Sequence, residues 1–123
     1  MMIYTGYYSK VKDYKSSGLT VVSISRTEPF PVDGKLTLLA PEESILWKYK
    51  NGEIDEMEYT SLYLDQLDRI GIRDILLGIH AFGDDVVLVC WEAPDKFCHR
   101  HILADYINKR TKLNIEEYGK SEV

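Results

Sequence analysis

The feature that most constrains the fold is an uninterrupted apolar run, Val86-Val87-Leu88-Val89-Cys90-Trp91, which follows the turn-forming triplet Gly83-Asp84-Asp85. A strand with one face in water alternates apolar and polar residues, whereas a strand covered on both faces does not. The run therefore predicts a central strand of a parallel sheet, with helices covering both of its sides.

Strand-like and helix-like segments alternate along the rest of the chain. Residues 2–8 and 19–25 are rich in β-branched and aromatic residues and predict strands. Apolar residues at three- and four-residue steps between Tyr59 and Ile70 predict a helix that Gly71 ends. We also expect helices at 9–17, 41–50, 72–81 and 96–110, a loop at 26–34 and a last short strand at 113–118.

This order predicts a single α/β domain over residues 1–123, a three-layer sandwich with a mostly parallel sheet of about four strands flanked by helices. No segment approaches the about 18 apolar residues of a membrane span. The first residues lack the charged and apolar regions of a secretory signal, so we expect a cytoplasmic protein. Cys90 and Cys98 are then expected to be reduced thiols, with a disulfide between them left as an open alternative.

The charge balance bears on possible partners. The net charge is −5, with 15 basic and 20 acidic residues, and the basic residues are dispersed. Coating duplex DNA requires many Lys and Arg contacts to phosphate, so we expect no duplex DNA partner. A pocket for one small anion remains open, because it needs local rather than net positive charge.

A ligand site is predicted at the carboxyl edge of the sheet, where open parallel sheets bind their ligands. The first strand delivers Thr5 and Gly6 to this edge, the second Arg26, and the apolar strand Glu92. The helix from residue 96 begins at the same edge and brings Cys98-His99-Arg100 in its first turn. At about 100° per residue, His99 falls on the apolar face, Cys98 and Arg100 lie to either side, and His101 points to solvent.

A resemblance follows from these residues. The strand ending Cys90-Trp91-Glu92, followed by Phe97-Cys98-His99-Arg100-His101, resembles the Cys-x-Glu…Cys-His-Arg signature of small bacterial and phage proteins, the domain of unknown function four-eight-eight. The family's typical opening resembles Gly-His-Ser, whereas this chain has Gly6-Tyr7-Tyr8, so any role of that histidine is absent here. The resemblance implies an α/β sandwich and no particular reaction, with a site built from Cys90, Glu92, Cys98, His99, Arg100 and Arg26.

The cysteines allow more than one interpretation. At a helix start, Cys98 would feel the positive end of the helix dipole and Arg100, which favours a reactive thiolate. The alternative is a small buried residue that fills a gap between helix and sheet. Cys90 lies within an apolar strand, where burial disfavours a thiolate. A phosphatase or rhodanese loop is rejected, because Glu92 and Pro94 suit an anion cradle poorly.

A metal site is not predicted. Cys90, Cys98, His99 and His101 lack the paired spacing of structural zinc sites. On one helix, His99 and His101 diverge by about 200°. Cys98 and His101 could share an ion, but that arrangement leaves His99 out. Cofactors are left open.

Glu92, Arg26 and Arg100 form the most plausible polar unit. In one interpretation they are a structural ion-pair network that fixes the helix on the sheet edge. In the other, the arginines bind a phosphate or carboxylate and Glu92 or His99 transfers a proton. Aromatic residues near this edge could stack a base or form an ordinary core rim: Tyr4, Tyr7, Tyr8, Trp47 and Tyr49.

Our leading hypothesis is a domain that binds a small phosphate- or nucleotide-like anion. The binding residues would be Arg26, Arg100, Thr5, Gly6 and Cys90, with thiol or acid/base chemistry from Cys98, His99 and Glu92. The alternative is a non-catalytic module for protein or single-stranded nucleic acid, in which the cysteine, histidine and arginine cluster is structural. Whether the protein is an enzyme, and its oligomeric state, are left open.

Overall fold

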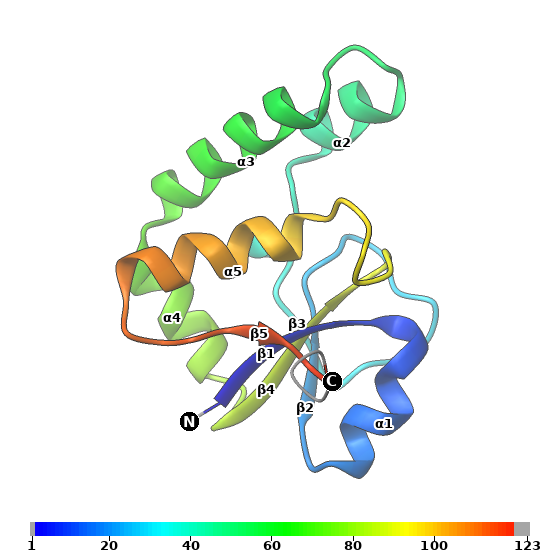
Figure 1. Cartoon of the computed structure of the whole chain (residues 1–123), viewed down its shortest axis with the longest axis vertical. Helices are drawn as coiled ribbons and strands as arrows, with labels where there is room; N and C mark the ends of the chain where they lie inside the picture. The colour runs from blue at the N-terminus through cyan, green and yellow to red at the C-terminus, as the bar shows by residue number, and fades with distance from the viewer. Residues whose placement is uncertain (1, 120–123) are drawn as a thin grey trace.

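The apolar run forms the central strand of the sheet, β4 (Asp85–Cys90), and residues 86–90 are inaccessible to solvent. Trp91, the last residue of the predicted run, lies beyond the strand and is 49% exposed. The computed structural model describes residues 2–119. In it β4 lies between β2 (Thr20–Ser23) and β1 (Met2–Tyr7), with β3 (Gly34–Lys35) beyond β2 and β5 (Glu116–Glu117) beyond β1 (Figure 1). Every strand pairing is parallel. The predicted α/β class is confirmed, with five strands in place of about four.

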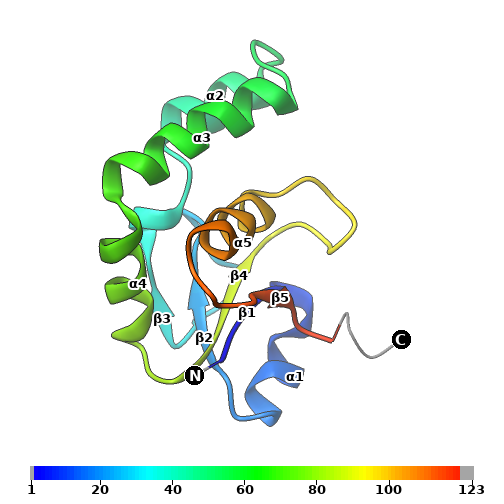
Figure 2. The ribbon, with the colours of Figure 1, turned by 60° about the vertical axis from the view of Figure 1, so that its left-hand side comes forward.

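Helices cover both faces of this sheet. α3 (Glu56–Ile70), α4 (Ile72–His80) and α5 (His99–Arg110) lie on one side, and α1 (Val11–Ser16) lies on the other (Figures 1 and 2). α2 (Glu43–Lys50) pairs with α3 in a hairpin that extends past the carboxyl ends of the strands (Figure 1). Two 3₁₀ turns, Tyr8–Lys10 and Thr37–Leu39, complete the regular structure of the described residues.

The two sides of β4 enter two separate apolar clusters, which explains why the strand lacks alternation. Val86, Leu88 and Cys90 pack in the large cluster with α3, α4 and α5. Val87 and Val89 pack in a smaller cluster with α1, including Tyr14. Both faces of the strand are therefore dry, as the apolar run predicts.

Three details differ from the sequence-based expectations. The segment expected as a loop at 26–34 ends in a strand, β3, held to β2 through Asp33, whose carboxylate accepts a hydrogen bond from the Val21 amide at 2.8 Å. α5 begins at His99 rather than near residue 96, and Cys98 is its N-cap, in extended conformation. His101, expected to face solvent, is half-buried.

Within the described part of the chain, no helix is both long enough and apolar enough to cross a membrane.

Candidate functional site

A cavity of about 600 Å³ opens at the carboxyl edge of the sheet, bounded by the loop after β2, by α2 and by the loop between β4 and α5. Five residues predicted for the site line it: Arg26, Cys90, Glu92, Cys98 and His99. The structure thus brings together residues that are up to 73 positions apart (26 to 99) in the sequence. This edge is where parallel sheets place their ligands.

A second cavity, of about 690 Å³, is larger but has different chemistry. It lies between β1, α1 and the chain around Tyr118, and its described lining residues include no cysteine and no histidine. Volume alone therefore does not select the site. We take the smaller cavity as the candidate site, because cysteine, histidine and charged side chains converge on it.

Cys90 and Cys98 meet at the floor of the candidate cavity. The structure joins their sulfurs in a disulfide, which corrects the expectation of two reduced thiols. The Cα atoms of the pair lie 7.8 Å apart, beyond the roughly 4.4–6.8 Å of most disulfides. His99 Nδ1 lies 3.7 Å from Cys98 Sγ, so the imidazole of His99 lies beside the two sulfurs, and all three residues are buried.

The ring of His99 is held in one tautomer. Its Nε2 lies 2.6 Å from the carbonyl oxygen of Ile24, which can only accept a hydrogen bond, so Nε2 carries the proton. Nδ1 is left with a lone pair that faces Cys98. Burial lowers the pKa of His99 to about 4, against the opposing effect of the bond to Ile24, so the imidazole is neutral near pH 7.

Arg100 lies behind the cavity and is completely buried. Its Nε and Nη2 each donate to a carboxylate oxygen of Glu117 at 3.0 Å, and Nη1 donates to the Cys90 sulfur at 3.0 Å and to the Glu92 carbonyl at 2.7 Å. The sequence predicts a polar unit of Arg100, Arg26 and Glu92 and leaves its pairings open, whereas the structure pairs the Arg100 guanidinium with the carboxylate of Glu117. Arg100 therefore does not line the cavity but bonds Cys90 and Glu92, which do.

Glu117, the partner of Arg100, was not predicted from the sequence. Thr5, predicted as a ligand-binding residue, donates to the Glu117 carboxylate at 2.7 Å and does not line the candidate cavity. Burial raises the pKa of Glu117, but the hydrogen bonds from Arg100 and Thr5 outweigh it, and the net pKa lies below its ordinary value. Gly6, also predicted for the site, lies against Tyr14 rather than in the candidate cavity.

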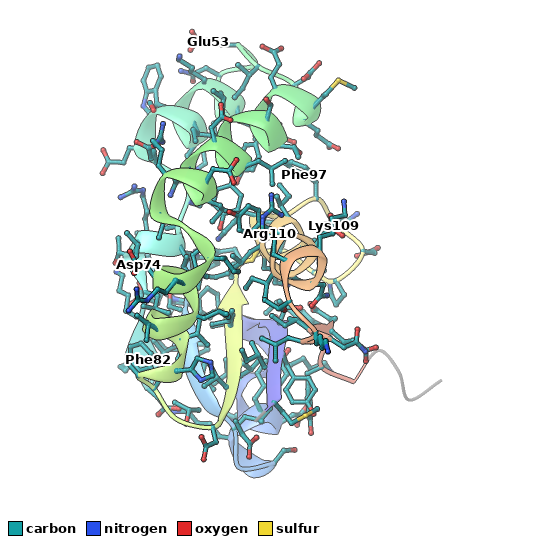
Figure 3. All side chains as sticks on the ribbon, turned by 90° about the vertical axis from the view of Figure 1, so that its left-hand side faces the viewer. Glu53, Asp74, Phe82, Phe97, Lys109 and Arg110 are labelled. Carbon is teal, nitrogen blue, oxygen red and sulfur yellow. A yellow bond between two sulfur atoms is a disulfide. The ribbon has the colours of Figure 1, made fainter. Side chains whose placement is uncertain are left out.

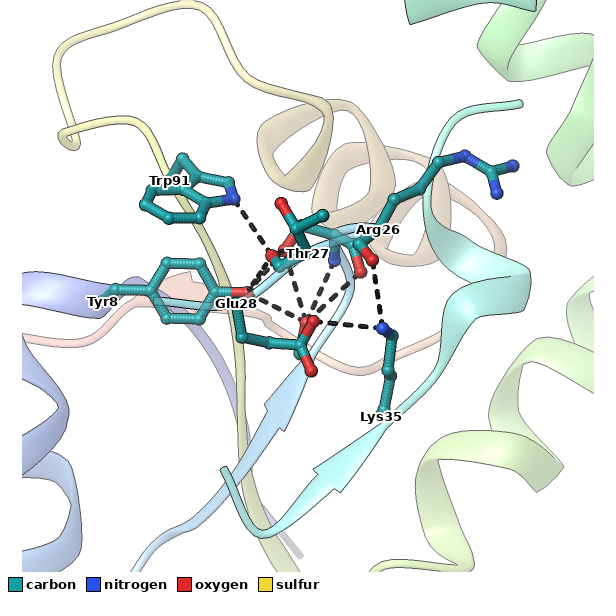
Figure 4. A network of polar contacts seen from close by, with 8 residues as sticks. Tyr8, Arg26, Thr27, Glu28, Lys35 and Trp91 are labelled. Atoms are coloured by element: carbon teal, nitrogen blue, oxygen red, sulfur yellow. Dashed lines mark hydrogen bonds and ion pairs between the residues drawn. The ribbon is translucent and has the colours of Figure 1, made fainter. Parts of the chain in front are cut away.

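Arg26 lines the cavity from the loop that follows β2, and hydrogen bonds from neighbouring side chains hold this loop. Lys35 donates to the Arg26 carbonyl at 3.0 Å and pairs with Glu28 at 3.0 Å, while the Trp91 indole donates to the Thr27 carbonyl at 3.0 Å. The Arg26 side chain points away from this network (Figure 4). Its Nε donates to the Pro41 carbonyl at 2.8 Å, and its side chain is 31% exposed.

Aromatic rings form the wall opposite the strands. Tyr49, Tyr59 and Phe97 pack with ring centroids 5.0–5.6 Å apart, and Figure 3 shows Phe97 beneath the α2–α3 hairpin. Trp47 adds an indole that is 68% exposed. Trp47 and Tyr49 were expected near the edge from sequence, whereas Tyr59 was expected on the core face of its helix and is both buried and part of the wall.

The remaining tyrosines named from the sequence do not line the candidate cavity, although Tyr7 ends β1 and Tyr8 follows it. Tyr4 packs against Tyr118 with centroids 5.0 Å apart. Tyr8 packs against Trp91 at 5.1 Å and bonds Ser23 through its hydroxyl at 2.9 Å. Tyr7 lines the larger, second cavity.

A fully parallel sheet with helices on both faces, and a cavity that joins cysteine, histidine and arginine at the strand ends, define a three-layer α/β domain with a candidate active site. The chain belongs to the DUF488-N3a family: the model of that family, described as the active DUF488-N3 subclade, matches residues 15–111. This confirms the resemblance carried by the Cys-x-Glu…Cys-His-Arg segment. No curated protein and no solved structure matches the chain significantly.

Proposed function

We propose that the cavity at the carboxyl edge binds a small anionic, nucleotide-like ligand and presents it to Cys98, His99 and Glu92 for thiol or acid/base chemistry. The observation that carries the proposal is the composition of the lining. Cationic side chains, exposed aromatic rings and the cysteine–histidine cluster occur together there. The volume of about 600 Å³ lies within the range of small-molecule sites.

The anionic part of the ligand is assigned to Arg26 and Lys50. Both side chains line the cavity, and the carboxylate nearest to Arg26, that of Glu43, is 3.8 Å away and 86% exposed. So exposed an ion pair contributes little, which leaves the guanidinium available to an anion. Glu43 and Glu92 also line the cavity. The two carboxylates offset the charge of the two cations, so the lining favours the smaller negative charge of a monophosphate over that of a triphosphate.

The planar part of the ligand is assigned to the aromatic wall. Trp47 is largely exposed and lies on α2, next to the cations. Stacking of a base on such a ring contributes about 1–3 kcal/mol per base. A nucleoside monophosphate satisfies both features, because it carries a flat base at one end and a phosphate at the other.

The chemical step is assigned to Cys98, with His99 as its partner. Reduction of the disulfide by an external dithiol returns two thiols, and the free lone pair of His99 Nδ1 then faces the Cys98 sulfur. The position of Cys98 at the N-terminus of α5 also favours its thiolate. A nucleophile beside an oriented base is the arrangement that covalent catalysis requires.

A second candidate function is supported by the exposed face of the α2–α3 hairpin, which shares Trp47 with the cavity. Trp47 and Met57 are 68% and 81% exposed, and both lie on the α2–α3 hairpin that extends past the sheet. Large apolar side chains on a projecting element are typical of a docking surface for protein or single-stranded nucleic acid. In that case the cluster around Arg100 is purely structural.

A thermal-shift series on the reduced protein separates these functions. The probes are inorganic phosphate, a nucleoside, the nucleoside monophosphate, the triphosphate and a short single-stranded DNA. We expect the monophosphate to stabilise most, since a ligand at about 100 times its Kd adds about 2.7 kcal/mol. Stabilisation by single-stranded DNA alone would favour the docking function.

Two arginine variants locate the response. Arg26→Ala removes the cation at the cavity mouth, while Arg73→Ala removes an exposed arginine on α4, away from the cavity. We expect the first to abolish the monophosphate shift and the second to keep it. Equal shifts in both variants would contradict the proposal.

A further inference from the structure

We propose that Cys90, Cys98 and His99, once the two cysteines are reduced, bind a thiolate-preferring divalent cation of the Zn²⁺ class. Each residue offers one ligand atom, and the three atoms lie within 4.8 Å of one another. All three residues are buried. The inference stands apart from nucleotide binding, because it uses none of the cations or aromatic rings assigned to that ligand. It replaces the thiol chemistry proposed above, because the Cys98 sulfur and His99 Nδ1 would then be metal ligands.

The distance between the Cys98 sulfur and the His99 nitrogen suits a tetrahedral ion, and the two sulfurs, which are bonded in the structure, would have to separate on reduction. With Zn–S near 2.3 Å and Zn–N near 2.0–2.1 Å, a tetrahedral site places sulfur and nitrogen about 3.6 Å apart and two sulfurs about 3.8 Å apart. Cys98 Sγ and His99 Nδ1 are already 3.7 Å apart. The wide Cα separation of the cysteines, 7.8 Å, lets both side chains converge on one point from opposite sides.

His99 is prepared for a metal by its second ring nitrogen. A histidine that binds a metal donates its other N–H to a carboxylate or to a backbone carbonyl, which fixes the tautomer. His99 Nε2 makes this contact with the Ile24 carbonyl at 2.6 Å, and Nδ1 is the free atom. Helix geometry separates His99 from His101 by about 200°, whereas the strand residue Cys90 and the N-cap residue Cys98 both place their sulfurs near His99.

The surroundings also favour thiolates at this position. The guanidinium of Arg100 donates to the Cys90 sulfur at 3.0 Å, and such hydrogen bonds stabilise negative sulfur. The charge of Arg100 is balanced by Glu117, so two thiolates would neutralise a divalent ion without a net buried charge. Soft sulfur and imidazole ligands select Zn²⁺ over Mg²⁺ or Ca²⁺.

The position of the cluster makes this an open site. Structural zinc takes four protein ligands, whereas sites with three leave a position for water or substrate. Cys90, Cys98 and His99 all line the candidate cavity of about 600 Å³, so the fourth position would face its interior. An oxygen atom of an anionic ligand could occupy it.

The test is a metal titration of the protein reduced with a phosphine and stripped by a chelator. Co²⁺ is the probe, because thiolate ligands give it a charge-transfer absorption band, and Zn²⁺ is then added as competitor. We expect one Co²⁺ per chain, a thiolate band, and displacement by one Zn²⁺. We also expect bound Zn²⁺ to protect both cysteines from alkylation.

Matched variants assign the ligands. Cys98→Ser keeps a good N-cap residue for α5. We expect it, like Cys90→Ser and His99→Gln, to weaken Co²⁺ binding at least about tenfold, because loss of a mere hydrogen-bond partner of a metal ligand already has that effect. His80→Gln, exposed on α4, should leave binding unchanged. Circular dichroism establishes that each variant is folded.

Two results would overturn the inference. One is a reduced wild-type protein that shows no thiolate band and whose cysteines are alkylated at the same rate with and without Zn²⁺. The other is equal Co²⁺ affinity in wild type and folded Cys98→Ser. Neither result affects nucleotide binding, which is tested by Arg26→Ala. Conversely, loss of nucleotide binding in Arg26→Ala with intact Co²⁺ binding supports both proposals.

Discussion

Arg100 and Glu117 form a bidentate ion pair in the interior, with Nε to Oε1 and Nη2 to Oε2 both at 3.0 Å. The pair ties α5 to β5, and Thr5 of β1 adds a third bond to the same carboxylate. Because His99 directly precedes Arg100, this contact also fixes the helix that carries the imidazole of the candidate site. The ion pair thus connects the edge of the sheet to the floor of the cavity.

Removal of Arg100 should destabilise the protein strongly. Arg100→Met leaves the carboxylate of Glu117 buried without its cation, and breaking a buried pair costs about 3–5 kcal/mol. Urea denaturation measures the loss. The double variant Arg100→Met/Glu117→Met removes both charges and should recover much of the stability. An Arg100→Met protein as stable as wild type would show that the pair does not hold α5.

Stability should fall in acid through Glu117. The net pKa of Glu117 in the folded protein lies below its ordinary value of 4.5, so Glu117 contributes stability above that pH and loses it as the pH falls through the folded-state pKa. Glu117→Gln should be less stable at neutral pH but should show a shallower dependence on pH below about 4.5. Denaturation midpoints measured between neutral pH and acid check this. Parallel curves for both proteins would exclude the effect.

Gly6 should tolerate no side chain. A Cβ at this position would lie 2.5 Å from the Tyr14 hydroxyl oxygen and 2.6 Å from the neighbouring ring carbon. Gly6→Ala should therefore cost about 1–3 kcal/mol, as overpacking in a core does. Gly78→Ala, within α4, is the matched control. A Cβ at Gly78 would approach the Leu36 side chain only to 3.4 Å, an ordinary van der Waals contact. That change should leave stability equal or raise it by up to about 1 kcal/mol.

Trp47 should matter for binding and not for folding. Its side chain is 68% exposed, so Trp47→Ala should shift the free energy of unfolding by less than about 0.5 kcal/mol. If a base stacks on the indole, the same change should weaken nucleotide binding by about 1–3 kcal/mol, roughly 5- to 150-fold. Calorimetric titration measures the affinity. Unchanged affinity would remove Trp47 from the ligand site.

Much of the fold could be predicted from local patterns. The apolar run of β4 indicates a doubly covered strand, and the periodicity of α3 together with Gly71 indicates its extent. β3 was not predicted, because its two residues carry no apolar pattern. Contacts with β2 hold it, including the hydrogen bond from the Val21 amide to the Asp33 carboxylate. Tertiary contacts decide such short edge strands, and sequence periodicity does not report them.

The candidate site was predictable in its place but not in its pairings. The rule that parallel strands end at one edge brought Arg26, Glu92 and His99 together, and all three line the cavity. The partner of Arg100 was not predictable, because Glu117 lies 17 residues later on a short strand. The approach of the Cys90 sulfur to within 4.8 Å of a His99 ring nitrogen likewise depends on how α5 packs on β4, which helix geometry alone does not specify.

The measurement that tests the central proposal most directly is an NMR titration of the reduced, isotope-labelled protein with a nucleoside monophosphate. We expect shifts centred on the Arg26 and His99 amides and on the Trp47 indole, which line the candidate cavity. Shifts centred on Tyr14 and Tyr118 would place the ligand in the second cavity instead. That result, or no shifts at all, would contradict the assignment of the carboxyl edge as the ligand site.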